Sequence, residues 1–231
     1  MFTLTPEELV AIKLSLRVAI VATAASLPIG ILIALALARG RFLGRGLLNA
    51  LVLVPLVLPP VVTGYLLLVT FGRNAPIGHW LAEHLGIVFA FRWTGAALAS
   101  AIMAFPLLVR AIRLSIEAVD RRLEQAAATL GANRLSVFAT VTLPLIAPGI
   151  FAGIILAFAR AMGEFGATLT FVSNIPGETQ TLPMLIHTFT QVPGGDAAAF
   201  RLTVVSLAIS LGAILASEAL AQRVSRRLHA V

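Results

Sequence analysis

The sequence predicts an all-α membrane protein: a polytopic helical bundle of five transmembrane helices, a short re-entrant or sixth segment, and a cytoplasmic helical hairpin. Two observations predict this fold class. Of the 231 residues, 59% are hydrophobic and 12% are charged, whereas soluble domains carry about 25% charged residues. The apolar residues also form long stretches, and crossing a bilayer takes about 20 residues of helix. We therefore expect one transmembrane domain over residues 1–231.

The first span lies between Arg17 and Arg39, which enclose 21 uncharged residues. Ahead of it, the tetrapeptide from Thr5 to Glu8 has the pattern of a helix start, with Thr5 as N-cap, Pro6 in the first turn and Glu8 at the capping-box position. We therefore expect the first helix to begin well before its apolar stretch.

The second span lies between Arg45 and Arg73, which enclose 27 uncharged residues. Pro55, Pro59 and Pro60 interrupt this stretch. Because each proline removes a backbone donor, we expect the helix to kink or partly unwind there.

Three further apolar stretches, at 93–109, 143–159 and 202–216, complete the five spans. The segment 181–191 is shorter and more polar, and Pro-Gly turns flank it. It is interpreted as a re-entrant or interfacial helix, with a sixth full span as the alternative.

Positive charge predicts the orientation in the membrane. The net charge is +7, but the arginines flank the apolar spans, which indicates membrane topology rather than nucleic-acid binding. With the N-terminus outside and the C-terminus in the cytoplasm, 11 Lys and Arg residues fall on the cytoplasmic side and 5 outside; cytoplasmic loops carry such an excess. The cytoplasmic residues are Arg39, Arg41, Arg45, Arg110, Arg113, Arg121, Arg122, Arg134, Arg223, Arg226 and Arg227.

Residues 124–144, EQAAATLGANRLSVFATVTLP, form a semi-polar stretch on the predicted cytoplasmic side. Its first part has apolar side chains on one face of a helix, at positions i, i+3, i+4 and i+7. These residues are Leu123, Ala126, Ala127 and Leu130. Alanines on such a face allow close approach of another surface, although a loop folded back on its own bundle is the alternative.

The second part of this stretch predicts another short helix. Gly131 is placed where a helix C-terminus favours a left-handed residue, and Asn133 is a good cap for the next turn. A second apolar stripe, at 135, 138 and 141, then precedes Leu143-Pro144, where we expect the next membrane helix to start. The pattern indicates two short helices at an angle.

This hairpin resembles the EAA loop of ABC-importer permeases, which reads Glu-Ala-Ala, three residues, Gly, nine residues, Ile-x-Leu-Pro. The resemblance implies that 117–144 is a coupling loop that docks on a cytoplasmic ATPase. Gln125 stands at the family's Glu position, with Glu124 one residue earlier, so the family's contact does not transfer unchanged. The implied coupling residues are Glu124, Gln125, Ala126, Ala127, Gly131, Val141, Leu143 and Pro144.

Four other stretches, 55–68, 105–120, 143–150 and 158–183, resemble molybdate-transporter permeases. This resemblance implies a path for a tetrahedral oxyanion, molybdate or tungstate, across the bacterial inner membrane. It also implies three protein partners: a second copy of the chain, a cytoplasmic ABC ATPase dimer, and an external or periplasmic oxyanion-binding protein. Sulfate permeases share the GEFG-type segment but are usually longer, and a sulfate-type permease is the alternative.

Arg160 and Glu164 are the candidate path or gate residues, because their spacing places them on one side of a helix. Ionisable groups at membrane depth usually face a bundle interior or a water path. A mutually neutralising pair that fixes helix packing is an equally weighted interpretation. Gly163 and Gly166 indicate a bend after this helix, which fits gating and ordinary turn chemistry alike.

Several motifs are absent from the sequence. There is no GxxxxGK[ST] phosphate loop, the only lysine is Lys13, and HExxH, GxSxG and cysteine are also missing. We therefore expect no catalytic residue, metal site or cofactor in this chain, with ATP and Mg²⁺ bound by a separate ATPase. An ATPase-independent secondary transporter is the remaining alternative, and the lack of an obvious two-half repeat counts against it.

Overall fold

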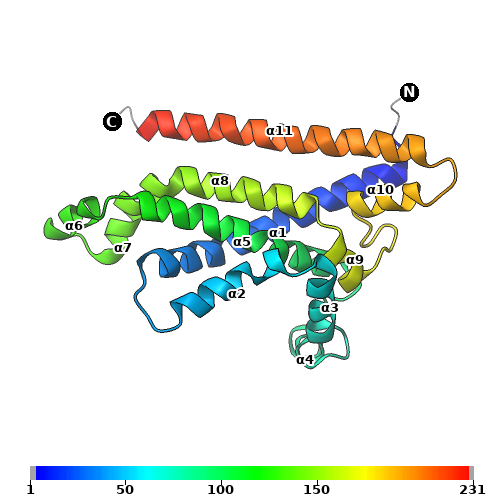
Figure 1. Cartoon of the computed structure of the whole chain (residues 1–231), viewed down its shortest axis with the longest axis horizontal. Helices are drawn as coiled ribbons and strands as arrows, with labels where there is room; N and C mark the ends of the chain where they lie inside the picture. Colours follow the sequence, from blue (N-terminus) through cyan, green and yellow to red (C-terminus); the bar gives the residue numbers. More distant parts are fainter. Residues whose placement is uncertain (1–3, 229–231) are drawn as a thin grey trace.

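The computed structural model describes the backbone of residues 4–228 and the side chains of residues 4–215. Helices are the only regular elements in this part of the chain (Figure 1), as the sequence predicts. They are α1 (Pro6–Arg39), α2 (Arg45–Val57), α3 (Pro60–Phe71), α4 (Pro76–Leu85), α5 (Trp93–Ala118), α6 (Arg121–Thr129), α7 (Arg134–Val137), η1 (Phe138–Thr142), α8 (Leu143–Met162), α9 (Gly166–Val172), α10 (Leu182–Thr190) and α11 (Asp196–Leu228).

The five predicted spans all correspond to helices. Within the described residues, four helical segments are each long and apolar enough to cross a membrane, and α2 with α3 makes a fifth if the bent pair is one span. The bend between α2 and α3 is 114° and falls at Leu58-Pro59. The expected interruption by prolines is confirmed, and α3 turns away from the long axis of the bundle (Figure 1).

The segment 181–191 contains α10, which has only nine residues. At 1.5 Å per residue it is about 14 Å long, less than half the thickness of a bilayer core. The alternative of a sixth full span is therefore wrong. Leu182 and Leu185 are fully buried, and they cluster with Ala11 of α1 and Leu202 of α11.

The core of the bundle lies between α1, α5 and α8. Leu108 and Ile112 of α5 are fully buried, as is Ile146 of α8. Gly153 of α8 faces Leu108 so closely that a Cβ there would lie 3.2 Å from its side chain. Small residues thus let these helices approach each other, as is usual in membrane bundles.

The start of α1 is fixed by the predicted capping box. Thr5 Oγ1 accepts the Glu8 N–H, and Glu8 Oε2 accepts the Thr5 N–H at 2.7 Å. The other carboxylate oxygen of Glu8 pairs with Arg201 of α11 at 2.5 Å, and Glu8 is fully buried. The beginnings of α1 and α11 are therefore tied together, and α11 runs back towards the end where α6 and α7 lie (Figure 1).

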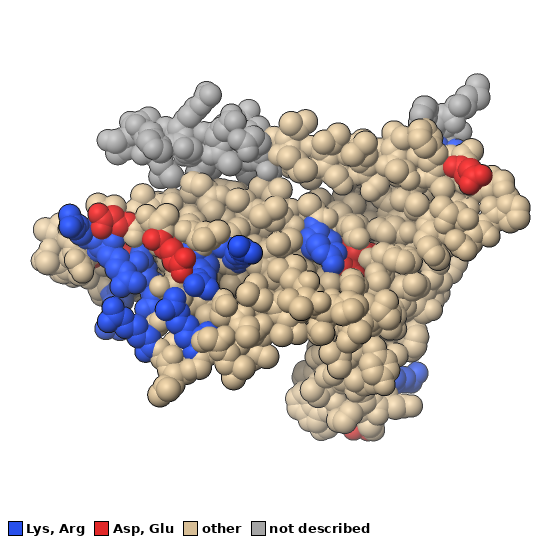
Figure 2. Space-filling model, in the orientation of Figure 1, with Lys and Arg blue, Asp and Glu red and all other residues tan. Residues whose placement is uncertain are grey.

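Cationic side chains gather at one end of the molecule. Figure 2 shows most of the visible Lys and Arg residues at the end occupied by α6 and α7. The described ones come from the last turn of α1, the start of α2, the end of α5 and the segment 121–134. This strong charge asymmetry matches the one that the sequence predicts.

Candidate functional site

The hairpin has the local design that its sequence predicts. Asp120 caps α6 by accepting the Arg122 N–H at 2.9 Å. Gly131 has a left-handed φ of +89° and donates its N–H to Ala128 O at 3.1 Å. Asn133 then caps α7 by accepting the Ser136 N–H at 2.8 Å. The backbone N–H groups at the helix ends and in the turn therefore find hydrogen-bond acceptors within the hairpin itself.

As predicted, the next membrane helix, α8, starts at Leu143, but no gap separates it from the hairpin. The chain remains helical from Arg134 to Met162, through the π-helical turn η1, in which Leu143 N–H donates to Phe138 O. Pro144 lies in the first turn of α8. The wider π turn relieves the clash between a proline ring and the carbonyl four residues earlier, so the helix continues.

The apolar face of the hairpin is uncovered. Leu130 is 89% exposed and Leu135 77% exposed, and Leu123 is also exposed. No side chain of α6 or α7 is buried: each is exposed or partly exposed, including Ala126 and Ala127. The alternative of a loop folded onto its own bundle does not agree with this exposure. Uncovered leucines beside charged residues are typical of a protein-interaction surface.

Glu124 holds the hairpin to the bundle. Its Oε1 pairs with Arg39 Nη2 of α1 at 3.1 Å and accepts the Thr142 Oγ1–H at 2.9 Å. Gln125 is exposed and makes no side-chain hydrogen bond to the described residues. The acidic contact between the hairpin and the bundle is therefore made by Glu124.

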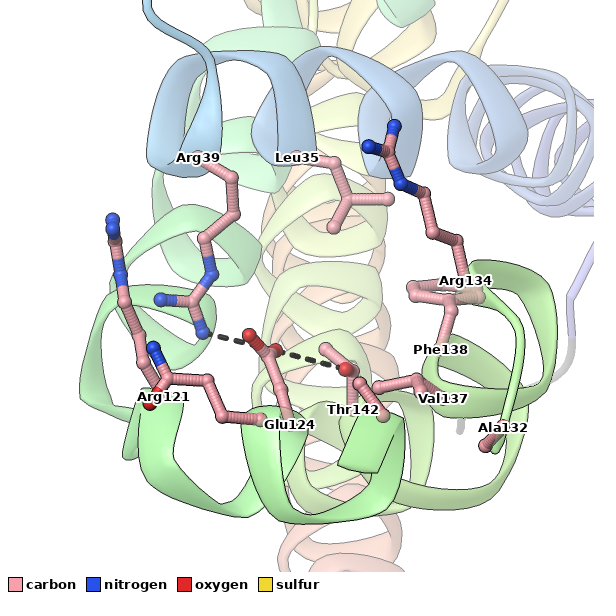
Figure 3. A pocket seen from close by; sticks show the side chains of 11 residues that line it. Leu35, Arg39, Arg121, Glu124, Ala132, Arg134, Val137, Phe138 and Thr142 are labelled. Atoms are coloured by element: carbon pink, nitrogen blue, oxygen red, sulfur yellow. Dashed lines mark hydrogen bonds and ion pairs between the residues drawn. The ribbon is translucent and has the colours of Figure 1, made fainter. Parts of the chain in front are cut away.

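A cavity of about 610 Å³ separates the hairpin from the end of α1. Figure 3 shows Arg39 reaching from α1 to Glu124, with Arg121 and Arg134 on either side. The hairpin thus stands off the bundle and touches it through few groups. Val141, Leu143 and Pro144, the remaining predicted coupling residues, are partly buried in η1 and the first turn of α8.

The second predicted site lies at the break between α8 and α9. Arg160 Nη1 and Glu164 Oε2 are 2.5 Å apart, and the two side chains are 26% and 1% exposed. Glu164 Oε1 also accepts the Ala167 N–H of α9 at 2.9 Å. The helix α8 ends at Met162 with Gly163 as its C-cap, and α9 begins at Gly166, so the expected bend after this helix is confirmed.

The sequence did not reveal what packs against this break. A Cβ on Gly166 would lie 2.9 Å from Pro60 Cβ, and one on Gly64 would lie 2.5 Å from Ala167 O. The break between α2 and α3 therefore lies directly beside the break between α8 and α9. The glycine in the stretch PPVVTG was the one sequence feature that pointed to a close approach.

Among the residues with described positions, no group of three or more His, Cys, Asp or Glu side chains lies close enough to hold a metal ion.

Comparison with known families identifies the chain. A family model described as "Binding-protein-dependent transport system inner membrane component" matches residues 26–226. This chain belongs to that family. It is 56% identical to the molybdenum transport system permease protein ModB of Escherichia coli (strain K12), over 96% of this chain and 97% of the relative.

A more distant relative and a solved structure of similar fold extend the comparison. The sulfate transport system permease protein CysT of Escherichia coli (strain K12) is 37% identical, over 96% of this chain and 80% of its own. The fold resembles that of a bacterial alginate ABC transporter in complex with alginate pentasaccharide-bound periplasmic protein, with a TM-score of 0.75, 17% identity, and coverage of 95% and 80% of the two chains. The chain is thus a multi-pass permease subunit of the inner membrane.

Proposed function

We propose that this chain is the permease subunit of an ATP-driven importer and forms the path for a tetrahedral oxyanion, molybdate or tungstate. The single observation that carries the proposal is the 56% identity to ModB over 96% of the chain. The relative named for sulfate is less similar, at 37%, and sulfate is the competing substrate.

The exposed hairpin supports docking of a cytoplasmic ABC ATPase dimer. The surface formed by Leu123, Leu130 and Leu135 is apolar and uncovered, and an amphipathic helix can bury such a face in a hydrophobic groove on a partner. ATP and Mg²⁺ belong to that ATPase in this proposal, and the permease chain itself holds no cofactor and no catalytic residue. A hairpin joined to α1 by an ion pair across a cavity is suited to transmit the movement of such a partner.

The same proposal sets the orientation. The basic end with the hairpin lies in the cytoplasm, as the positive-inside rule favours, and the N-terminus lies outside. At the outer side an external or periplasmic binding protein delivers the oxyanion, and a second copy of the chain completes the path. A single subunit offers only one wall, on which Arg160 and Glu164 are the charged residues beside Gly163 and Gly166.

Uptake measurements test this function. The chain is reconstituted in proteoliposomes with the ATPase and binding protein of its transporter, and uptake of radiolabelled molybdate is followed with and without ATP. We expect uptake that requires all three proteins, with tungstate competing better than sulfate. Uptake driven by an ion gradient without the ATPase would support a secondary transporter instead, and stronger competition by sulfate would move the chain to the sulfate class.

Replacement of the exposed leucines tests the docking surface. Leu130→Ser and Leu135→Ser should each weaken co-purification of the ATPase about tenfold or more, because burying a leucine contributes about 1.5–3 kcal/mol and 1.4 kcal/mol is a factor of ten. Leu85→Ser is the matched control, since Leu85 is 57% exposed at the end of α4, far from the hairpin (Figure 1). Equal losses in all three variants would contradict docking at the hairpin.

The chain contains no cysteine, so single introduced cysteines test the orientation. Thr129→Cys in α6 should react with an impermeant thiol reagent only from the cytoplasmic side. Thr190→Cys at the end of α10 should react only from outside. The reverse pattern would overturn the proposed topology.

A further inference from the structure

One carboxylate connects two helices at the break between α8 and α9. Glu164 Oε2 pairs with Arg160 in the last turn of α8, while Glu164 Oε1 accepts the Ala167 N–H in the first turn of α9. The Glu164 side chain is 1% exposed. Any partner that draws the guanidinium away from this carboxylate therefore also changes the group that caps α9.

The first turn of α9 has little room to move independently. Gly166 lies against Pro60 at the start of α3, and Gly64 of α3 lies against Ala167. A tilt of α9 must therefore be transmitted to α3, whose own connection to α2 is already broken by prolines. Two helix breaks in contact form a place where the bundle can change shape with little loss of backbone hydrogen bonding.

Arg160 keeps capacity for another anion. A guanidinium has five N–H donors in a planar fork, and among the described residues only Glu164 pairs with it. The side chain is 26% exposed, and a charge at membrane depth does not face lipid tails but a bundle interior or a water-filled path. The exposed part of Arg160 therefore faces the inside of the assembled permease.

We propose that the transported oxyanion competes with Glu164 for the guanidinium of Arg160, and that this exchange loosens the first turn of α9. The inference rests on the proposed function, because it takes the oxyanion as the substrate. An arginine fork binds carboxylates and tetrahedral oxyanions in the same bidentate manner. Because Glu164 already pairs with Arg160, it lowers the affinity of Arg160 for the oxyanion, so that the anion is released after it passes. No bond is made or broken.

A purely structural ion pair is distinguished by removing both charges. The double variant Arg160→Gln/Glu164→Gln leaves no unpaired buried charge and keeps an amide oxygen for the Ala167 N–H, so the fold is expected to survive. If the pair only fixed packing, transport would survive as well. If Arg160 binds the oxyanion, uptake falls at least about tenfold, which corresponds to 1.4 kcal/mol or more of lost interaction.

The closing experiment uses the complete transporter in proteoliposomes, with molybdate as the probe. Wild-type uptake is measured first, and failure of the wild type would overturn the proposed function rather than this inference. The double variant is then compared with His79→Gln/Glu83→Gln, which removes a pair of the same spacing on α4 and should leave uptake within about twofold, as is usual for exposed pairs. A double variant at Arg160 and Glu164 that transports like this control overturns the inference.

Glu164→Gln alone gives a readout that a structural role does not predict. Without its competitor, Arg160 should hold the oxyanion more tightly, so the apparent KM for molybdate falls while maximal uptake also falls. A raised KM with unchanged maximal uptake would contradict the exchange.

Hydrogen exchange on the unmodified transporter keeps the inference testable even if variants fold poorly. Saturating molybdate should accelerate exchange of the amides at 166–169 in α9 relative to the same complex without the anion. Unchanged or slower exchange there would overturn the loosening of α9.

Discussion

Two glutamates each pair with an arginine, but their surroundings differ. Glu124 of α6 pairs with Arg39 of α1, and Glu164, between α8 and α9, pairs with Arg160 of α8. Glu124 is 23% exposed and lies beside a cavity of about 610 Å³. Glu164 is 1% exposed and lies where α9 is packed against α3. The first contact anchors a hairpin that has free space beside it, whereas the second closes a break that is packed against another helix. The same chemistry therefore gives a joint that can move alone at one end, and inside the bundle a joint whose movement is shared by α9 and α3.

Energetics strengthen this contrast. A partly exposed ion pair contributes about 0–1 kcal/mol, whereas removing one partner of a buried pair costs about 3–5 kcal/mol because the remaining charge is uncompensated. Loss of the buried pair should therefore have the larger effect on stability.

Removal of each carboxylate tests the contrast directly. Glu164→Ala should lower the free energy of unfolding by about 3–5 kcal/mol, whereas Glu124→Ala should lower it by about 1 kcal/mol or less. Thermal unfolding of the purified complexes in detergent measures both changes. Similar losses of unfolding free energy for the two variants would contradict the contrast between a buried and a partly exposed ion pair.

The close approach of α3 to α9 provides the second test. Gly64→Ala would place a Cβ 2.5 Å from Ala167 O, and such overpacking costs about 1–3 kcal/mol. Gly46→Ala is the control, because nothing lies within 4 Å of a Cβ there, and alanine favours a helix over glycine by about 1 kcal/mol. Thermal unfolding should separate the two variants in opposite directions, and equal behaviour would argue against a tightly packed break.

The turn of the hairpin provides the third test. Gly131→Val places a β-branched side chain at a φ of +89°, and left-handed backbone costs L-residues about 1–2 kcal/mol. Because every side chain of α6 is partly exposed, the bundle should remain folded while ATPase co-purification and uptake are lost.

Gly194→Val is the control for that variant, since Gly194 has a φ of +79° and no atom within 4 Å of a Cβ, but lies between α10 and α11. It should keep ATPase co-purification. Loss of the ATPase in both variants would point to general destabilisation instead of a role for the hairpin.

The smallest changes in unfolding free energy are expected from substitutions of Glu124 and Gln125, which are neighbours in α6. Gln125→Ala should change the unfolding free energy by no more than about 0.5 kcal/mol, as is usual for surface positions. Glu124→Gln should cost up to about 1 kcal/mol and reduce ATP-driven uptake, because it weakens the contact with Arg39 and Thr142. A larger effect at Gln125 than at Glu124 in the uptake assay would reverse this assignment.

Local features of the fold were predictable because they depend on neighbours in the chain. The capping box at Thr5, the left-handed Gly131 and the cap at Asn133 each follow from one side chain and the backbone within a few residues. The apolar stretches likewise indicate spans by length and composition alone. The start of α8 at Leu143 was also predictable, but the π turn before it was not, because it depends on a choice between two helical registers that composition does not encode.

The candidate site was predictable only in part. The sequence singled out Glu124, Gln125, Arg160 and Glu164, but it could not distinguish which acidic or amide residue of the hairpin makes a contact, nor which interpretation of the buried pair holds. The contacts of Glu124 depend on Arg39 and Thr142, and the surroundings of Glu164 depend on the packing around Ala167. Whether Arg160 and Glu164 act on the path or fix packing stays a prediction.

By itself, the sequence determined the membrane fold, the helical design of the hairpin, the concentration of positive charge at one end and the resemblance to a transporter family. These depend on composition, periodicity and short-range hydrogen bonding, which are local properties. Only the tertiary structure decided that the hairpin stands over a cavity and that two helix breaks meet at Pro60 and Gly166. Both facts join residues far apart in the chain, and their contact is set by how whole helices pack.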